Sequence, residues 1–331
     1  MQISELARFF PKDPRTGEYQ HTGRAIFPLI KSQIDNLGLR KPQSLLELDK
    51  TAFFLAYKGY EHLLDRKPPQ YILHQLQVRT VAVNLAGHDP DTQIHPLTHD
   101  MGRAWDMNSK HRILGLYALI ALGYDPKSPY PQFALDHDMW GFGGRIGKQF
   151  LPEVDRFINK KTAAKGNEFF NEVLNGEYSK QLEPIFEGMY QLYLQNYGIS
   201  GPAVLIADNS KRKIAKNDSD EYKRYLTEIV AFTPELAQEL IDDQIKNGNY
   251  KENSPRHRIE ILGSQFLIYA INKFQEDTGI NYASQIQNAR LDWDSSIYHE
   301  SMSLWNEVID ETEKARPRFS TSIQTAIQAA Y

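Results

Sequence analysis

Apolar residues recur at helical spacing over long stretches of this chain, whereas alternating strand patterns are scarce. Residues 45–64 and 184–198 are two examples, because each segment places its apolar side chains on one helix face. Prolines and glycines fall between the helical stretches, where they are expected to end one helix before the next begins. The sequence therefore predicts an all-α protein whose core forms between apolar helix faces.

The chain has 331 residues, which is enough for one large domain or two ordinary ones. Its polar and charged segment 208–220 is typical of a loop between two helical parts. We predict an N-terminal helical extension, a catalytic domain and a C-terminal helical region over residues 1–69, 70–210 and 211–331.

The chain contains no cysteine, which excludes disulfides, thiolate metal ligands and cysteine nucleophiles. Its net charge of −4 is too small to direct it to nucleic acid or to an anionic membrane, although a local basic groove stays open. The longest apolar-rich stretch, 113–122, is shorter than the roughly 20 residues that cross a bilayer. The N-terminus has no apolar core of signal-peptide type. We expect a cytoplasmic protein with no membrane partner.

One histidine lies on the apolar face of a predicted helix. In the segment YILHQLQVRTVAVNLA, His74 shares a face with Val78, Val81 and Leu85. A single histidine in such a place is more often part of the core than a ligand. Its interpretation therefore depends on what the rest of the chain brings near it.

A histidine and an aspartate stand side by side in PLTHDMGRAW, residues 96–105. His99 and Asp100 would lie about 100° apart on a helix, so that both side chains can reach one ion. An imidazole and a carboxylate together suit Fe, Mn, Ni or Zn. Gly102 would allow another element to approach closely. Pro96 predicts that the preceding histidine, His95, lies before the helix.

The order of these residues resembles that of the HD-domain metal-dependent phosphohydrolase superfamily. His99 follows His74 by 25 residues, and the segment LTHDMGR resembles the "LLHDIGK" pattern of that family. The resemblance implies a helical bundle in which the first histidine and the HD pair, here His74, His99 and Asp100, are metal ligands.

Three downstream matches extend the resemblance to about residues 70–210, in the ligand order of the HD-GYP branch. They are His111 before Gly115, His137 in LDHDMWGFGG, and Asp208 at the end of VLIAD. The Gly-Tyr-Pro loop itself is not kept, so hydrolysis of cyclic di-GMP is not implied. His137 and Asp208 are 71 residues apart, which predicts a helical insertion at about 145–195.

The resemblance implies a metal-dependent phosphohydrolase or phosphodiesterase that hydrolyses a nucleotide, cyclic nucleotide or other phosphoester by a metal-activated water. One or two ions of Mn, Fe, Ni, Zn or Mg would be held by His74, His99, Asp100, His111, His137 and Asp208. The catalytic residues would be Asp100, His111, His137 and Arg103. The residues expected to contact substrate phosphate are Arg145 and Lys148.

Other interpretations stay open. The same ligand order occurs in HD-type nucleases that act on single-stranded nucleic acid, and a non-catalytic HD-like binding scaffold or a di-iron oxygenase would also use this fold. Without a second metal, His111 and His137 would contact phosphate or protonate the leaving group. Asp136 and Asp138 are either ligands or, respectively, a helix N-cap and a surface acid.

Overall fold

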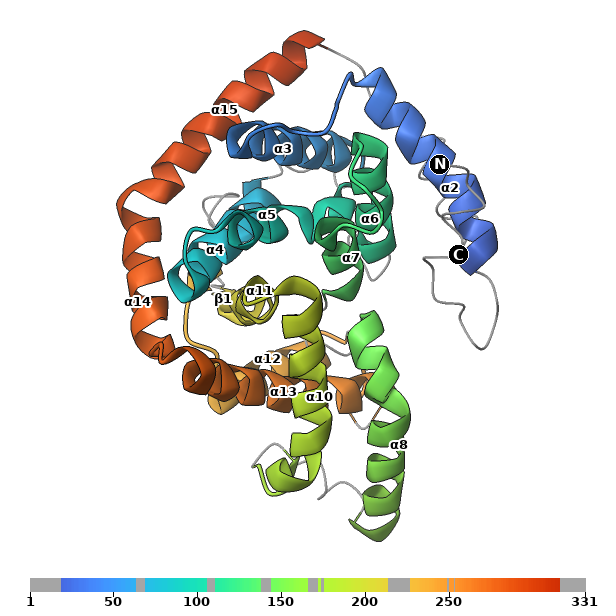
Figure 1. The fold of residues 1–331 in the computed structure, drawn as a ribbon, viewed down its shortest axis with the longest axis vertical. Coiled ribbons are helices and arrows are strands. Elements are labelled where there is room, and N and C mark those ends of the chain that lie inside the picture. Colours follow the sequence, from blue (N-terminus) through green and yellow to red (C-terminus); the bar gives the residue numbers. More distant parts are fainter. Residues whose placement is uncertain are drawn as a thin grey trace. The chain divides into compact units, whose positions relative to one another are not determined.

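The computed structural model describes residues 19–63, 69–105, 111–137, 144–165, 172–173, 176–213, 227–248, 250–252 and 254–315. Helices dominate these ranges (Figure 1), and the two short strands form one antiparallel pair. The predicted all-α class is therefore confirmed. Asp138 lies outside the described residues.

The helices of the chain and their bounds are α2 (Tyr19–Asn36), α3 (Leu45–Leu63), α4 (Pro69–Ala86), α5 (Pro90–Thr98), the 3-10 turn η1 (Met101–Ala104), α6 (His111–Leu122), α7 (Pro129–Asp136), α8 (Arg145–Lys165), α10 (Ser179–Tyr197), α11 (Ser200–Asn209), α12 (Pro234–Lys246), α13 (Pro255–Thr278), α14 (Tyr282–Asp292), the π-helical turn η3 (Trp293–Ile297) and α15 (Tyr298–Ala315). The strands are β1 (Lys211–Lys213) and β2 (Thr227–Ile229).

Prolines and glycines mark several of the helix ends, as the sequence predicts. The hydroxyl of Thr233 accepts a hydrogen bond from the backbone N–H of Leu236 and caps α12, which starts with a proline. Ser254 caps α13 in the same way, by accepting from the N–H of His257. Gly279 then ends α13 in the left-handed conformation that favours glycine.

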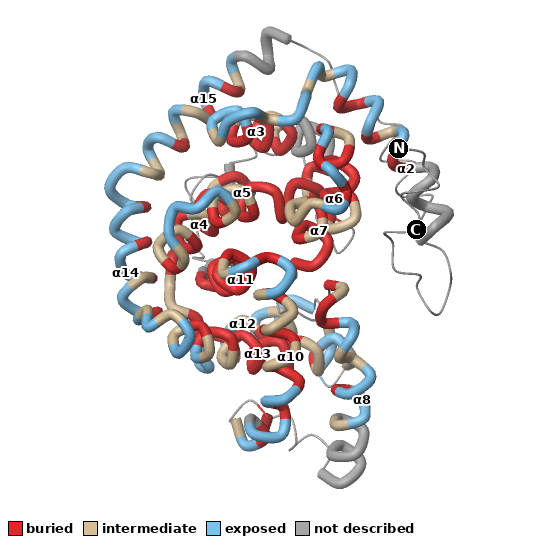
Figure 2. The backbone as a smooth tube through the Cα atoms, in the orientation of Figure 1, coloured by how far each residue is buried: buried red, intermediate tan, exposed pale blue. Residues whose placement is uncertain are grey.

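The chain forms two compact units, each built from segments that are far apart in the sequence. The first unit comprises residues 1–76, 93–135 and 295–331. Within it, η1 packs against α3 and α6, α2 packs on α6, and α15 packs on α3. Helix α6 is buried over most of its length (Figure 2) and forms the centre of this unit. Burial of the apolar side chains of this helix stabilises the unit.

The second unit comprises residues 77–92 and 136–294. Helix α10 packs against α8, α11 and α13, and α12 lies on α13. Phe186, Tyr193 and Phe266 are fully buried in this core, and Phe266 contacts both other rings. Helices α8 and α10 occupy the range of the predicted insertion. The three predicted domain ranges and the insertion itself stay predictions.

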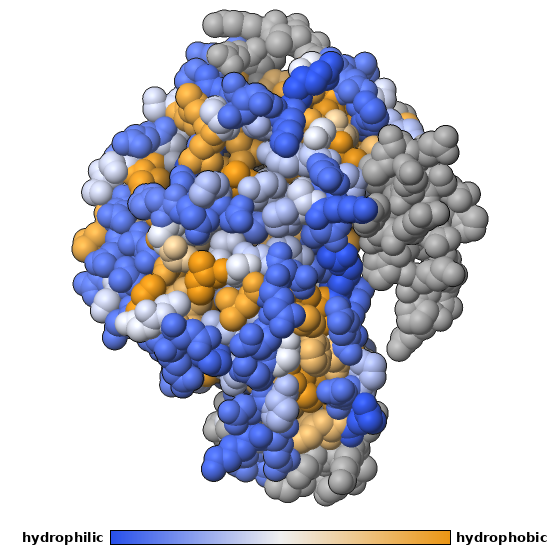
Figure 3. Space-filling model, in the orientation of Figure 1, coloured by the Kyte–Doolittle hydropathy of each residue, from blue (hydrophilic) through white to orange (hydrophobic). Residues whose placement is uncertain are grey.

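On the face that Figure 3 shows, the coloured surface is mainly hydrophilic and its apolar residues lie in separate patches. Among the described helices, none has both the length and the apolar character that crossing a bilayer requires.

Candidate metal centre

Asp100 is the centre of a group of polar side chains in the first unit. It lies between the end of α5 and the start of η1, and its side chain is only 1% exposed. A buried carboxylate is unfavourable unless positive or proton-donating groups surround it. Four side chains surround this one, and they are those of His74, His99, Arg103 and His111.

The two oxygens of Asp100 have different partners. Oδ2 lies 3.2 Å from Nε2 of His74 and 3.5 Å from Nε2 of His99. It also lies 2.7 Å from Nε of Arg103. Oδ1 instead lies 3.1 Å from Nε2 of His111. Imidazole nitrogens therefore lie near both oxygens of the carboxylate.

The contact made by Nδ1 of His99 determines which of its two ring nitrogens carries the proton. Nδ1 lies 2.6 Å from the carbonyl oxygen of Pro96, and a carbonyl oxygen only accepts hydrogen bonds. Nδ1 therefore carries a proton and donates it. In neutral His99 the lone pair is then on Nε2, which lies 3.5 Å from Oδ2 of Asp100. A proton or a metal ion between the two atoms would relieve their repulsion.

Helix α4 supplies His74, and a buried hydrogen bond ties this part of α4 to α5. Gln75, the next residue, donates from Nε2 to the carbonyl oxygen of Leu97 at 3.0 Å. The rings of His74 and His99 meet edge to face with their centroids 5.6 Å apart. The structure thus brings His74 together with the HD pair.

Gly102 allows α6 to approach Asp100. A Cβ atom at Gly102 would collide with the carbonyl oxygen of His111 and with the backbone nitrogen of Gly115. Helix α6 therefore packs backbone to backbone on η1, and its first residue, His111, reaches Oδ1 of Asp100. The close approach predicted at Gly102 is confirmed.

The donor set of His74, His99 and Asp100 fits a divalent transition metal ion. One possible ligand atom from each residue lies within 4.8 Å of the others. Ligand atoms about 2.0–2.2 Å from one ion, at tetrahedral or octahedral angles, are about 2.9–3.5 Å apart. The distances of 3.2 and 3.5 Å from Asp100 to the two imidazoles fall within that range. A metal-binding capacity is therefore supported by the geometry and by the chemistry of the donors.

Four other predicted site residues belong to the second unit. His137, directly after α7, is buried, and Asp208, near the end of α11, is half-buried. Lys148 is exposed on α8, whereas the guanidinium of Arg145 is hydrogen-bonded to Asp136. The proposed roles of these four residues in metal and phosphate binding stay predictions.

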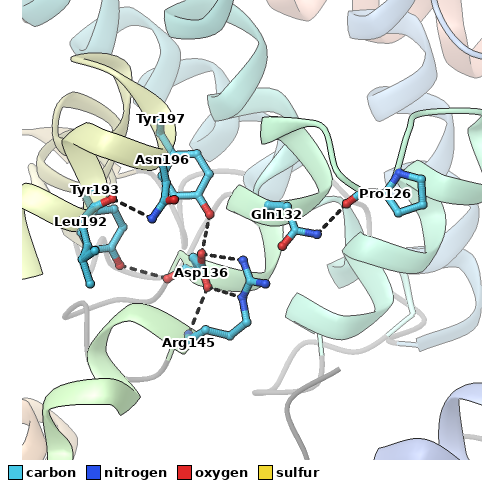
Figure 4. Close-up of polar contacts among 8 residues, drawn as sticks. All are labelled: Pro126, Gln132, Asp136, Arg145, Leu192, Tyr193, Asn196 and Tyr197. Atoms are coloured by element: carbon cyan, nitrogen blue, oxygen red, sulfur yellow. Dashed lines mark hydrogen bonds and ion pairs between the residues drawn. The ribbon is translucent and has the colours of Figure 1, made fainter. Parts of the chain in front are cut away.

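Asp136 is the centre of a second polar cluster, which sequence reasoning left open (Figure 4). One of its carboxylate oxygens, Oδ1, accepts from the backbone N and Nε of Arg145 at 3.1 and 2.8 Å. The other, Oδ2, accepts from Nη2 of Arg145 at 2.9 Å and from the hydroxyl of Tyr197. The hydroxyl of Tyr193 donates to the backbone carbonyl of Asp136 at 3.0 Å. Asp136 is the last residue of α7, and its Oδ1 accepts from the backbone N–H of the first residue of α8.

Charge and burial fix the protonation of this second cluster. Burial, and then the negative charge and hydrogen bonding of Asp136, hold the pKa of Tyr197 far above its ordinary value. Burial alone would lower the pKa of Arg145, but its hydrogen bond to Asp136 and the carboxylate charge outweigh burial and raise that pKa. Tyr197 therefore stays protonated and donates a hydrogen bond to Asp136, and Arg145 stays charged.

His95 lies inside α5, so the prediction that it precedes the helix was wrong. Its ring is fully buried, stacked on Phe133 with centroids 4.6 Å apart, and it meets Tyr130 edge to face. A proline inside a helix loses one backbone hydrogen bond and crowds the preceding turn, and the aromatic packing of His95 opposes this cost.

Comparison of the chain with protein-family models, with curated proteins and with solved structures found no match.

Proposed function

We propose that this protein is a metal-dependent phosphohydrolase or phosphodiesterase of the HD type, with a metal centre built on His74, His99 and Asp100. One observation carries the proposal: two imidazoles from separate segments face the same oxygen of a buried carboxylate. Nitrogen and oxygen donors of this kind suit Mn, Fe, Ni or Zn, and the carboxylate also suits Mg.

Three further residues complete the proposed ligand set, by the resemblance of the ligand order. Asp208 would be the fourth ligand of the first ion. His111 and His137 would hold a second ion together with Asp100, where two ions are bound. The contact of 3.1 Å between His111 and Oδ1 of Asp100 supports this part of the proposal.

A bound ion would supply Lewis acidity toward phosphoryl oxygens and would lower the pKa of water. The chain's own residues orient the centre and the substrate. The bond from Nδ1 of His99 to Pro96 fixes its ring, so that Nε2 faces the centre. Arg103 contacts Asp100 through Nε and its side chain is 29% exposed, and in this proposal its guanidinium would contact a phosphate group of the substrate. Where one ion is bound, His111 would instead donate a proton to the leaving oxygen.

The direct test combines bound metal with hydrolysis. Wild type loaded with Mn²⁺ is analysed for metal by mass spectrometry and assayed with bis(p-nitrophenyl) phosphate, with nucleotides and cyclic nucleotides, and with single-stranded DNA. We expect bound metal and hydrolysis of a small phosphoester in wild type, and neither in His99→Ala. The exposed His88 provides the matched control, and His88→Ala should keep both properties.

The other outcomes separate the alternatives. A wild type with neither metal nor hydrolysis contradicts the proposal. Hydrolysis of single-stranded DNA alone would instead identify a nuclease. Tightly bound metal with no hydrolysis of any of these substrates would favour the non-catalytic scaffold.

A further inference from the structure

Several hydrogen bonds of the second unit converge on Asp136, whose role the sequence left open. Asp136 is 1% exposed, and its two carboxylate oxygens accept four hydrogen bonds from Arg145 and Tyr197. Its backbone carbonyl accepts a fifth, from Tyr193. Hydrogen bonds thus hold both the side chain and the backbone carbonyl of Asp136, and they fix the position and the direction of the chain at this residue. The next residue is His137, a predicted metal ligand.

The chain closes tightly on itself at this point. A Cβ atom at Gly144 would collide with the backbone carbonyl of Asp136, so the start of α8 packs directly on the end of α7. Arg145, which follows Gly144, reaches Asp136 with its backbone N–H as well as its side chain. The backbone on which His137 lies is therefore held from α8.

Helix α10 holds the same point from another direction, and it continues into the helix that carries Asp208. Tyr193 and Tyr197 are four residues apart and lie on one face of α10. A Cβ atom at Gly201 would collide with Tyr193 and Tyr197, so α11 leaves α10 through a close corner. Asp208 lies two helical turns after Gly201, on the same face of α11.

We propose that Asp136, Arg145, Tyr193 and Tyr197 are positioning residues that fix His137 for metal binding and tie it, through α10, to the helix that presents Asp208. The proposal rests on the proposed function, in which His137 and Asp208 are ligands. Outer partners of this kind orient ligands and strengthen metal binding, because a ligand held in place loses less conformational freedom when the ion binds.

The test measures the affinity of the full-length protein for Mn²⁺, by following free Mn²⁺ with electron paramagnetic resonance. Tyr197→Phe removes one hydroxyl from Asp136. Tyr190→Phe is the matched control, because Tyr190 is a buried tyrosine of the same helix whose hydroxyl is not one of the donors to Asp136. His137→Ala shows the effect of losing the ligand itself.

We expect Tyr197→Phe to weaken Mn²⁺ binding by about 10- to 100-fold, and His137→Ala by at least as much. Tyr190→Phe should leave the affinity unchanged, although each tyrosine variant loses one buried hydroxyl and some thermal stability. Arg145→Lys keeps the charge but loses the two-pronged contact, so it should also weaken binding. It provides the same test if Tyr197→Phe does not fold.

Three results would overturn the inference while leaving the proposed function intact. In the first, Tyr197→Phe and Arg145→Lys bind Mn²⁺ as tightly as wild type. In the second, Tyr190→Phe weakens binding as much as Tyr197→Phe. In the third, His137→Ala binds as tightly as wild type, so that the network has no ligand to position. A wild type that binds no metal would instead overturn the proposed function, and the inference with it.

Discussion

Asp100 in the first unit and Asp136 in the second are equally buried, yet their surroundings differ in kind. Each carboxylate is 1% exposed, and each contacts an arginine. The remaining partners of Asp136 are hydroxyl and backbone donors with fixed protons. Those of Asp100 are imidazoles, each of which can offer either a proton or a lone pair.

The difference separates a structural carboxylate from one that is suited to a cation. Donors that keep their protons saturate Asp136 and leave no role for an added ion. A neutral imidazole can offer a lone pair on the side of Asp100, and a cation between them would satisfy the carboxylate and the rings together. Burial alone therefore does not distinguish the two aspartates, and the chemistry of their neighbours does.

The largest expected effect comes from the same substitution at the two aspartates, with metal removed by a chelator. Asp136→Asn places an amide N–H₂ against Arg145 and Tyr197, which are donors, and it removes one charge of a buried pair. We expect it to lower the free energy of unfolding by about 3 kcal/mol. Asp100→Asn also takes the carboxylate charge away from an arginine, Arg103, but its amide can donate to an imidazole lone pair, so it should cost less than Asp136→Asn, by about 1 kcal/mol. Urea denaturation of both variants tests this order, and a larger loss at Asp100 would contradict the comparison.

Metal removal should affect stability through Asp100. An ion that binds only the folded state stabilises it by about 2.7 kcal/mol at 100 times its dissociation constant. We therefore expect Mn²⁺ to raise the unfolding midpoint of wild type and a chelator to lower it. Asp100→Asn should show neither response, and thermal unfolding with and without Mn²⁺ measures both. An equal response in wild type and variant would place the ion elsewhere.

Near each aspartate, one glycine allows two backbone segments to pack in direct contact. Gly102→Ala would push η1 away from His111, and Gly144→Ala would push the start of α8 away from Asp136. We expect each to lower the free energy of unfolding by about 1–3 kcal/mol, because a backbone cannot yield as a side chain does. Gly188→Ala is the control, since its Cβ would meet only the ring of Phe150. Denaturant unfolding should rank it as the mildest, and an equal loss in all three would refute the backbone argument.

The smallest expected effect concerns a histidine outside both clusters. His257 is buried beside Tyr250, and burial lowers its pKa although the charges of Glu252 and Asp242 raise it. The folded state thus favours neutral His257, so stability should be complete above about pH 6.5 and should fall as the pH drops below that value. His257→Gln should remove this part of the pH dependence, as measured by unfolding at pH 7.5 and pH 5.5. An unchanged dependence would show that His257 does not titrate with folding.

The sequence predicted the parts of this structure that follow from local pattern. Helical spacing predicted the all-α class, and the His74 and His99-Asp100 segments are together in the first unit. The Asp136 cluster was missed because Tyr193 and Tyr197 are 57 and 61 residues away from Asp136. In sequence they are indistinguishable from core aromatics of an amphipathic helix.

The failed prediction at Pro96 has a related cause. Proline disfavours a helix through one missing hydrogen bond and a local clash, both of which depend on sequence neighbours. The stacking of His95 on Phe133 depends on a helix that lies further along the chain. Tertiary packing of this kind overrides a local preference, and the residues next to Pro96 in the sequence do not predict such packing.

Metal content tests the central claim most directly, because the account makes Asp100 a cation ligand. Wild type, Asp100→Asn and the surface control Asp35→Asn would be purified together, dialysed against Mn²⁺ and analysed by mass spectrometry. We predict one or two equivalents of bound metal in wild type and in Asp35→Asn, and none in Asp100→Asn. Equal metal in all three proteins, or none in wild type, would contradict the account.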